Sequence, residues 1–519
     1  MEDNSQEASK IVDRTEEGVL ASLAARAPSY TTLEQQLAKF RSACQDYILH
    51  DFAAAAEAKV ESRLWDAHSK VNQKFRPLLA QFREGECKKK PVERRKAEKL
   101  YLEFIKSSMR FYRGYIQGLA SNFSGMPEIV EIARKFNLET LSADTPLSVD
   151  LLLKKQIIRS CYSTLVQLGD LSRYRETELQ TKERNWGPAK GYYGLASALD
   201  PTTGIASNQL AVIALTDQDH LRAVYHLYRA ICVDNPAPQA QGNLKLEFKK
   251  IKKRSVQGKQ ILSEDAAAEG SREFQNKFLL FHARCFLEEY DDEEDEQNEI
   301  LRLLSGELRE RPYDTMIRKF CLINISAQNL AATRVRNDSS TFRSFEIAQH
   351  MNVATLVMLL ELLLDELRPP TKDTARSNHS RDGPSRLTPL VRRILPHLRL
   401  YSGWLLSTVQ QLLANRTQRV QIAALWQTYA EALSLLTHTF PVIREVPELP
   451  YLLDEDRDTL AFSPFSNFVK ETRFQDAGHI PKPVHDESVS GPQSSQAQML
   501  YRVKCLVRDA VYLCKKVCL

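Results

Sequence analysis

The chain has 519 residues, of which 43% are hydrophobic and 26% are charged, so it is long enough for two or three domains around a large core. Only 18 residues are glycine, which argues against a turn-rich β architecture and against glycine-rich nucleotide loops. The formal net charge of +5 permits contact with nucleic acid without indicating it, and a solvated surface of mixed charge is the simpler interpretation.

The N-terminal half reads as a series of helices. Residues 1–30 are acidic and polar at the start, do not form a signal peptide, and are expected to be flexible. Apolar residues then recur every three or four positions from Thr32 onward, which predicts a helix. A second helix is predicted over 52–82, interrupted or kinked by Pro77. Further helices are predicted around 100–119 and, long and buried, over 150–174.

Two helix pairs follow, with a spacing typical of tetratricopeptide repeats. Pro201 and Pro236 lie 35 residues apart by their numbers, close to that repeat's period of about 34 residues. Ala189 and Ala196 occupy the positions where the repeat needs small residues, so that paired helices can approach closely. Two approximate copies are too few for a solenoid, so these helices are expected to belong to a larger helical domain.

The second half continues in the same helical pattern. Residues 245–259 are basic, and the strongly acidic run 288–299 is expected to be a solvated connection between helices. Two segments, 369–386 and 476–495, have the composition of disordered loops. Strand signals are nearly absent, so the fold class is all-α. Amphipathic helices are predicted over 271–288, 297–308, 313–334, 341–367, 387–414, 418–438 and 499–517.

Several functional classes are disfavoured. The nine cysteines include no Cys-x-x-Cys pair and no zinc-ligand spacing, so most are expected to be reduced core thiols, with no metal site. The apolar run 353–364 is interrupted by Glu361 and is short for a membrane span, so we expect no membrane contact and a cytoplasmic or nuclear location. Phosphate-loop, metalloprotease and serine-hydrolase motifs are missing, so we expect no catalytic residues, no cofactor and no enzyme activity.

One cluster stands out against this background. The stretch 168–175, Leu-Gly-Asp-Leu-Ser-Arg-Tyr-Arg, places basic residues inside an apolar helical pattern. A basic cluster on a packed helical scaffold indicates a pocket for an anion, and therefore a binding protein rather than an enzyme.

This stretch resembles the Smg/Ever-Shorter-Telomeres family when it is taken with the segments that follow it. The resemblance continues through 191–201, 208–211, 223–230 and 235–244. Weaker similarity covers 64–70, 100–112 and 453–465, so it extends over most of the chain. Members of this family act in nonsense-mediated mRNA decay and in telomerase recruitment.

The resemblance implies a domain organisation and a site. It implies a 14-3-3-like domain with tetratricopeptide-like helices over 31–245, followed by a helical-hairpin domain over 246–519. It further implies a phosphopeptide site formed by Lys70, which follows Leu-Trp, and by Arg173, the first Arg of Arg-Tyr-Arg. Tyr174 and Asn208 match residues that hold phosphate and peptide backbone, and Lys74, one turn after Lys70, is a lesser candidate.

The chemistry of phosphate supports such a set. A phosphoserine carries about −1.5 to −2 charges and several acceptor oxygens, so one cation does not neutralise it. An arginine supplies a planar fork of donors and a lysine adds a compact charge. A tyrosine hydroxyl completes the shell, and an asparagine amide is suited to clamp the backbone of the ligand.

Each of these residues also has a purely structural interpretation. Arg173 is within reach of Asp170 and Glu176 as an internal ion pair, and Lys70 alone would be an ordinary solvated lysine. Tyr174 is equally suited to the core, and Asn208 to capping a helix that starts near Gln209.

Two functions remain open. The first is an adaptor of nonsense-mediated mRNA decay, whose partners would be a phosphorylated RNA helicase of mRNA surveillance and possible paralogues of this chain. The alternative is a telomerase-associated factor that binds single-stranded nucleic acid or telomerase components. The basic stretches 88–99, 245–259 and 386–398 are candidates for that second role, but they lack the interleaved aromatic residues on which bases stack.

Overall fold

The computed structural model confirms the all-α fold class. It describes residues 2–25, 29–83, 90–138, 146–179, 183–259, 261, 269–290, 293–310, 315–338, 341–368, 386–440, 446–465, 474–475, 482 and 495–517. Within them, the β structure is a short parallel pair, β1 (Phe123–Ser124) with β2 (Leu147–Ser148), together with single bridge positions at Thr203, which pairs with Asn235, and at Leu452 and Gln475. The predicted loops 369–386 and 476–495 lie almost entirely outside the described residues.

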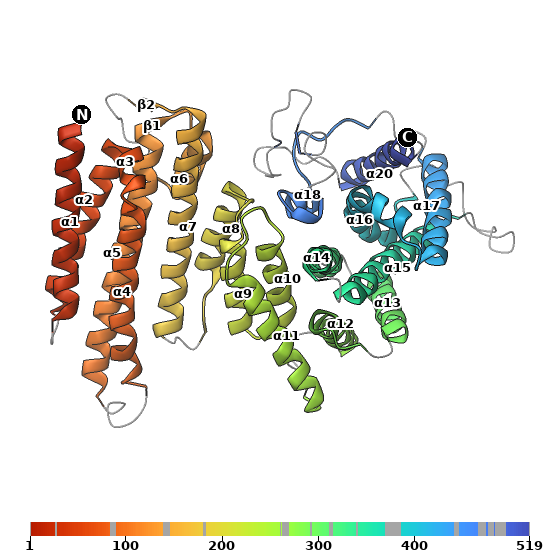
Figure 1. Cartoon of the computed structure of the whole chain (residues 1–519), viewed down its shortest axis with the longest axis horizontal. Coiled ribbons are helices and arrows are strands. Elements are labelled where there is room, and N and C mark those ends of the chain that lie inside the picture. The colour runs from red at the N-terminus through yellow and green to blue at the C-terminus, as the bar shows by residue number, and fades with distance from the viewer. Residues whose placement is uncertain are drawn as a thin grey trace. The chain divides into compact units, whose positions relative to one another are not determined.

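The chain divides into two compact units, Met1–Asp200 and Pro201–Leu519 (Figure 1). This division falls earlier in the chain than the predicted domain boundary at 245, between the two helix pairs that resemble tetratricopeptide repeats. The predicted extent of the 14-3-3-like domain therefore stays a prediction, and each unit is described by itself below.

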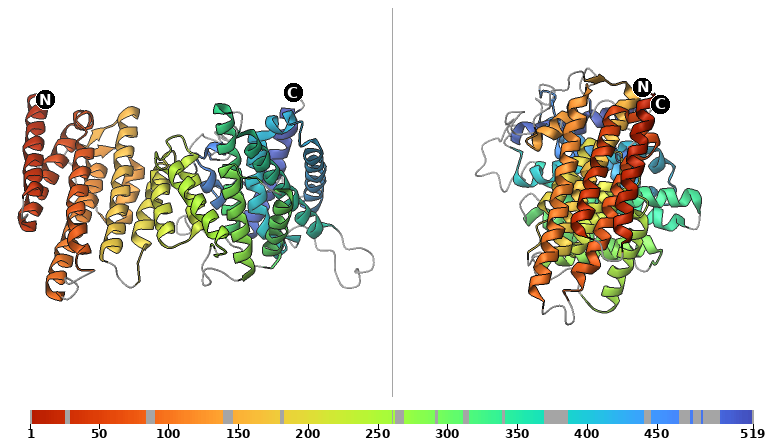
Figure 2. Two further views of the ribbon diagram at one scale, coloured as in Figure 1. Left: turned by 60° about the horizontal axis from the view of Figure 1, so that its bottom comes forward. Right: turned by 90° about the vertical axis from the view of Figure 1, so that its left-hand side faces the viewer.

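The first unit is an array of long helices that stand side by side (Figures 1 and 2). Each long helix packs on its neighbours in the series α1, α2, α4, α5, α7 and α8. Its helices are α1 (Glu2–Ala24), α2 (Tyr30–His50), α3 (Phe52–Glu57), α4 (Val60–Ala80), α5 (Pro91–Asn122), α6 (Pro127–Lys135), α7 (Leu151–Leu179) and α8 (Gly187–Leu199).

Three of the helices predicted from the apolar periodicity of the sequence are confirmed in this unit. The apolar repeat behind the Thr32 helix forms the buried face of α2, and the Ser29 side chain caps its first turn. Pro91 opens α5 at the first helical turn, where its missing N–H has no helical partner to lose. The long helix predicted over 150–174 is α7, which continues to Leu179.

Two predictions in this unit are corrected. The N-terminal segment expected to be flexible forms α1, which buries Val12, Val19 and Leu23 and packs on α2. The helix predicted over 52–82 is two helices, because Lys59 adopts a left-handed backbone conformation with φ of 52° between α3 and α4. Pro77 lies in the last turn of α4 rather than at a break.

The second unit begins with the later tetratricopeptide-like helices and continues into a larger bundle. Gly204 is required at the first turn, because a Cβ there would lie 2.2 Å from the Ala230 carbonyl oxygen. The helices are α9 (Ile205–Thr216), α10 (His220–Ile231), α11 (Ala240–Val256), α12 (Glu269–Leu287), α13 (Glu293–Glu310), α14 (Thr315–Asn337), α15 (Phe342–Leu367), α16 (Pro389–Ala414), α17 (Arg419–Thr439), α18 (Asp454–Thr459), the 3₁₀ turn η6 (Ser463–Phe465) and α20 (Ser495–Val517).

A continuous apolar core runs through this unit from α9 to α20. The acidic run at 288–299 is not only a connection, since its second half forms the first turns of α13. By length and composition α15 would span a membrane, which corrects the expectation that this run is too short, but 72% of its most apolar window is buried inside the protein. The fully buried polar residues Gln349, Asn352 and Thr355 on the same helix agree with a core position.

The cysteines agree with the expected reduced state. Six of them are buried free thiols, at positions 44, 161, 232, 285, 321 and 505, and Cys514 is exposed and free. Cys87 and Cys518 lie outside the described residues.

Candidate functional site

Arg173 projects from α7 and is held by three neighbours in the first unit. Its Nη2 donates to the Asp170 carboxylate over 3.0 Å, and its Nε donates to the Tyr193 hydroxyl over 3.3 Å. Its guanidinium carbon lies 4.7 Å from the centre of the Tyr174 ring, within cation–π distance. The side chain is nevertheless 15% exposed, so Arg173 is fixed in orientation and still reaches solvent.

The Leu-Gly-Asp motif explains this geometry. Tyr193 on α8 is fully buried, and its hydroxyl donates to Asp170 over 2.6 Å. A Cβ on Gly169 would lie 2.3 Å from the Tyr193 ring, so only glycine lets α8 approach α7 this closely. Ala189 and Ala196, the predicted small residues of α8, are fully buried as expected.

The electrostatics of the cluster follow from burial. Burial raises the pKa of Asp170 above its ordinary value, and this effect outweighs Arg173 and Tyr193, which lower it. Burial opposes the charge on Arg173, but Asp170 and Tyr193 outweigh that opposition and raise its pKa, so Arg173 stays charged. One buried carboxylate therefore faces a permanent cation that retains access to solvent.

The structural interpretation of Arg173 is thus partly correct. Asp170 pairs with Arg173, whereas Glu176 pairs with Arg175 over 2.7 Å and also accepts from the Asn185 backbone N–H. Tyr174 is half-buried, and burial is the main reason that its pKa is raised. The ion pair accounts for the position of Arg173, and the side chain keeps its partial exposure to solvent beside it.

Lys70 and Lys74 lie exposed on α4, which packs against α7. Sequence reasoning missed Arg76 on the same helix, whose Nε lies 2.9 Å from the Glu178 carboxylate on α7. A helix turns about 100° per residue, so Lys70 lies about a third of a turn around α4 from Arg76. Because it pairs with Glu178, Arg76 is the α4 cation that the structure places beside α7, and it is still 58% exposed.

A shared neighbour connects Arg76 with Arg173. Burial, followed by Glu178 and Tyr174, raises the pKa of Tyr101, whereas Arg76 and Arg173 act to lower it. Both arginines therefore lie close enough to this buried hydroxyl to influence its charge. Sequence spacing gives no sign of this, because the contact depends on how α4, α5 and α7 pack.

Asn208 lies in the second unit, inside α9 rather than at its start, so it does not cap that helix. It is buried, and its side-chain oxygen accepts from the Asn243 amide over 3.2 Å. This bond joins two asparagines of the family-like motifs, Asn208-Gln-Leu-Ala and Asn243-Leu. Its predicted role toward a peptide stays a prediction.

The basic stretches differ in how their charges are used. In 386–398, Arg386 donates to the Leu367 carbonyl at the end of α15, and Arg393 donates to the Leu308 and Arg309 carbonyls near the end of α13 over 2.6 and 2.8 Å. These arginines satisfy carbonyl groups at helix C-termini, which is a structural use of the charge. In the described part of 88–99, Lys90 pairs with Glu93 and Arg94 with Glu98 on the surface of α5.

The stretch 245–259 presents lysines on α11. Lys245, Lys249, Lys252 and Lys253 border an open hollow of about 590 Å³, together with the strongly exposed Val256. Lys252 forms an ion pair with Glu289, which leaves an excess of positive charge on this face.

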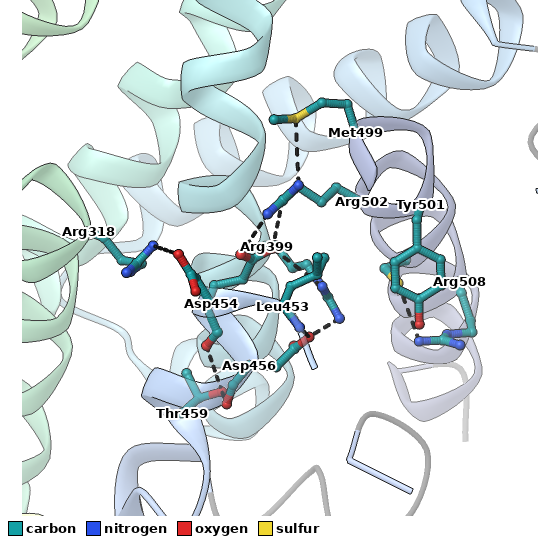
Figure 3. Close-up of polar contacts among 12 residues, drawn as sticks. Arg318, Arg399, Leu453, Asp454, Asp456, Thr459, Met499, Tyr501, Arg502 and Arg508 are labelled. Carbon is teal, nitrogen blue, oxygen red and sulfur yellow. Dashed lines mark hydrogen bonds and ion pairs between the residues drawn. The ribbon is translucent and has the colours of Figure 1, made fainter. Parts of the chain in front are cut away.

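A second arginine cluster lies deep in the second unit (Figure 3). Arg399 on α16 lies 3.3 Å from Glu455 and 2.9 Å from Asp456, and Arg502 on α20 lies 2.7 Å from Glu455. Burial opposes the charge of Glu455, but Arg502 and Arg399 outweigh it and hold its pKa below the ordinary value. Arg399 and Glu455 are each 1% exposed, so this cluster is internal and cannot meet a ligand.

This cluster gives the family-like segment 453–465 a structural role. Asp456 accepts from the Leu453 backbone N–H over 3.1 Å, which fixes the first turn of α18. Arg318 on α14 binds Asp458 over 2.5 Å. Three helices, α14, α16 and α20, are therefore joined through the carboxylates of one short helix.

Among the described residues, no group of three or more His, Cys, Asp or Glu side chains could hold a metal ion. The fold and the sites together define a class of all-helical proteins, in which the partly exposed Arg173 is oriented on one array of helices and a buried charge cluster joins the helices of a second bundle.

Comparison with known proteins identifies the family. A family model described as "Est1 DNA/RNA binding domain" matches residues 189–468, and one described as "Telomerase activating protein Est1" matches residues 59–179. The first match alone covers more than half of the chain. The chain belongs to the Est1/SMG family, as the sequence resemblance predicted.

Individual relatives come from both branches of this family. The nonsense-mediated mRNA decay factor SMG7 of Arabidopsis thaliana is 27% identical over 218 residues, which is 39% of this chain and 20% of the relative. The telomere elongation protein est1 of Schizosaccharomyces pombe is 29% identical over 190 residues, 35% of this chain and 38% of the relative. The chain thus spans about a fifth of the length of the plant relative.

The fold has a close counterpart among solved structures. The crystal structure of Est1 and Cdc13 contains a chain that matches 98% of this chain and 96% of its own length, with a TM-score of 0.69 and 13% identity. At this level of identity the likeness establishes the helical fold of the family.

Proposed function

We propose that this protein is a non-catalytic adaptor whose first unit binds phosphoserine peptides. The observation that carries the proposal is the state of Arg173, which is oriented by Asp170, Tyr193 and Tyr174 while part of its side chain stays exposed. Phosphate binding needs a guanidinium that is already oriented and still accessible, because ordering a flexible arginine would cost side-chain entropy.

Exposed cations on α4 support the proposal. Lys70, Lys74 and Arg76 are exposed on α4, which packs against α7, and Arg76 pairs with Glu178 on α7, so α4 carries positive charge beside the helix that bears Arg173. Asp170 limits the net charge of the cluster, so Arg173 alone would bind phosphate weakly. Because the Asp170 carboxylate partly neutralises Arg173, we propose that the α4 lysines supply the additional positive charge that the phosphate needs.

The relatives suggest a pathway for such an adaptor. The SMG7 relative is a nonsense-mediated mRNA decay factor, and the partner that we propose is a phosphorylated RNA helicase of mRNA surveillance, in the cytoplasm or nucleus. A paralogue of this chain is a further proposed partner. The proposal includes the absence of catalysis, since the candidate site is built for a charged ligand and not for a reaction.

The test compares two labelled peptides of identical sequence by fluorescence anisotropy, one with a single phosphoserine and its unphosphorylated twin. We expect the phosphorylated peptide to bind at least about tenfold more tightly, because a charged hydrogen bond contributes about 1.5 to 3 kcal/mol. Phosphatase treatment should remove the difference. Equal affinity for both peptides would refute the proposed function.

A second candidate function rests on the lysine face of α11. Four lysines border one hollow inside the region matched by the Est1 DNA/RNA binding domain, which favours contact with a phosphodiester backbone and a telomerase-associated role. If this is correct, single-strand binding should weaken with salt, with a log–log slope of about −0.7 for each phosphate contacted.

Paired substitutions make that test specific. Replacing Lys249 and Lys253 by glutamate should abolish single-strand binding, whereas replacing Lys39 and Lys106, which are also exposed but lie outside the basic stretches, should leave it unchanged. An equal loss in both variants would mean that binding reports net charge alone, and the second function would then be rejected.

A further inference from the structure

A stripe of exposed cations runs along α5 in the first unit. A helix turns about 100° per residue, so five of its basic residues lie within a sector of about 60° around the helix axis. Between the first and the last of them, every α5 residue in this sector is a lysine or an arginine, and each is exposed. With a rise of about 1.5 Å per residue, the stripe is about 27 Å long. This α5 stripe consists of Arg95, Lys99, Lys106, Arg110 and Arg113.

The stripe faces away from the core of the unit. The buried residues of α5, such as Tyr101, Ser108 and Tyr115, lie on the opposite side of the helix. Within the described ranges, the stripe cations other than Arg113 form no hydrogen bond or ion pair with another side chain. Internal ion pairs therefore do not account for this row of charges, in contrast to Arg94, which pairs with Glu98 on the same helix.

Arg113 is held in one orientation at the end of the stripe. Its Nε donates to the Tyr192 hydroxyl on α8 over 2.8 Å, and its Nη2 donates to the same oxygen. Its guanidinium carbon lies 5.8 Å from the centre of the Phe136 ring and 5.7 Å from that of the Tyr192 ring. Arg173, which is held by the neighbouring Tyr193, pairs with Asp170, whereas no carboxylate in the described part of the chain pairs with Arg113. The Nη1 donors of Arg113 are therefore left for a ligand.

The surroundings of the stripe favour a protein as its partner. Leu102 and Met109, both half-buried, lie beside the stripe on α5, and Val92, which is 71% exposed, continues its line toward the N-terminus. Glu103 borders the other side. Apolar side chains of a partner would gain from covering Leu102 and Met109. A nucleic acid would gain less, because the stripe sector holds no aromatic residue on which a base would stack.

We propose that the α5 stripe binds an acidic amphipathic helix of a partner protein. Acidic residues on one face of a helix recur every three or four positions, which matches the steps of four, seven, four and three residues between the stripe cations. The apolar edge of such a helix would pack on Leu102 and Met109. A carboxylate accepts two N–H bonds from one guanidinium, so the oriented Arg113 would fix one end of the partner. The surface does not include Arg173 and does not depend on the phosphopeptide proposal.

The test measures how the full chain binds two synthetic helical peptides of about 18 residues, a length that matches the stripe. Both contain the same numbers of glutamate, leucine, alanine and glutamine. In the first peptide the glutamates lie on one face with the leucines at its edge, and in the second they are distributed around the helix. By fluorescence anisotropy we expect a dissociation constant on the order of 0.1 mM for the first, from several weak ion pairs, and binding at least about fivefold weaker for the second. Equal affinities would overturn the proposal.

Substitutions separate the stripe from the net charge of the protein. Lys106→Gln combined with Arg110→Gln removes two stripe cations. The matched control combines Lys155→Gln with Arg159→Gln, two exposed cations on α7 with the same spacing. We expect the first pair to weaken binding of the one-faced peptide about threefold to tenfold and the second to change it less than about twofold, because each exposed ion pair contributes modestly. Circular dichroism should verify that both variants stay folded.

An oligonucleotide tests the other kind of occupant. Oligodeoxythymidine of about 18 nucleotides should bind the wild type and the stripe variant equally, whatever its affinity. If the stripe variant alone loses oligonucleotide binding, the stripe is a nucleic-acid surface and the proposal is wrong. Equal losses of peptide binding in the two double variants would also overturn it, as would no binding of the one-faced peptide at about 1 mM.

Discussion

The two arginine clusters are built from the same arginine–carboxylate ion pairs but differ in their exposure to solvent. Arg173 in the first unit has one carboxylate, Asp170, and 15% of its side chain is exposed to solvent. Arg399 and Arg502 in the second unit share Glu455, Arg399 also pairs with Asp456, and Arg399 is only 1% exposed. The number of carboxylates and the exposure of the arginine therefore distinguish Arg173, which we propose binds phosphate, from the structural Arg399.

The largest loss of stability is expected when the buried ion pairs of Glu455 are broken. Glu455→Gln would leave Arg399 and Arg502 with one carboxylate fewer in a site closed to water. Breaking a buried ion pair in this way costs about 3 to 5 kcal/mol of stability. Urea unfolding followed by circular dichroism should show this loss in the second unit. The matched control is Asp454→Asn, whose half-exposed carboxylate lies 3.5 Å from Arg318 and should contribute less than about 1 kcal/mol.

A substitution at Gly169 tests whether the first cluster depends on close helix packing. Gly169→Ala forces a methyl group into the Tyr193 ring, and overpacking of this kind costs about 1 to 3 kcal/mol. Thermal unfolding should show the loss. Gly191→Ala on α8 meets no atom within 4 Å and should be neutral or slightly stabilising, because alanine favours a helix. Equal effects at both positions would mean that the Tyr193 contact is not tight.

Opposite pH dependences should distinguish the clusters. The pKa of Glu455 is lowered to about 2, so its contribution to stability is present above its unfolded pKa, near 4.5, and is lost as pH falls toward 2. The pKa of Asp170 is raised, so its contribution is present below its unfolded pKa and is lost as pH rises through the folded one. Denaturation midpoints should be measured from pH 2 to 7 for both variants. Glu455→Gln should lack the fall in midpoint toward pH 2, and Asp170→Asn should lack the fall in midpoint as pH rises through the folded pKa of Asp170.

The smallest effect concerns the lysines on α4. Lys70→Gln should weaken phosphopeptide binding about threefold to tenfold, since an exposed charge contributes about 0.2 to 1 kcal/mol and somewhat more to a dianion. Lys74→Gln should weaken it less. Arg76→Gln measures the contribution of the cation that the structure places beside α7. Anisotropy titrations would rank the three substitutions. A larger effect at Arg76 than at Lys70 would mean that the phosphate binds nearer to Arg76 than the family resemblance predicts.

The local sequence pattern predicted most of the helices but few of the contacts between them. The apolar repeat of α2 and the tetratricopeptide-like Ala189 and Ala196 were readable because each buries a face set by helical spacing. The helix α1 was missed because its few apolar residues, such as Val12 and Val19, are embedded in polar sequence. Its burial depends on α2.

The contacts in the two arginine clusters also differ in whether the sequence predicts them. Arg173 and Asp170 are three residues apart on one helix, so their pairing was foreseeable from sequence. The contact of Arg76 with Glu178 and that of Arg399 with Glu455 join residues distant in sequence, and only the packing of helices brings them together. The placing of Lys70 near Arg173 stays a prediction from the family resemblance.

The most direct test of the central claim is a double-mutant cycle between the peptide phosphate and Arg173. Dissociation constants are measured for wild type and Arg173→Gln, each with the phosphorylated and the unphosphorylated peptide, with Arg175→Gln as the matched control. An accessible, oriented Arg173 predicts a coupling of at least about 1.4 kcal/mol, a tenfold difference, which Arg175→Gln leaves unchanged. A coupling near zero, or an equal one at Arg175, would show that Arg173 serves only its ion pair with Asp170.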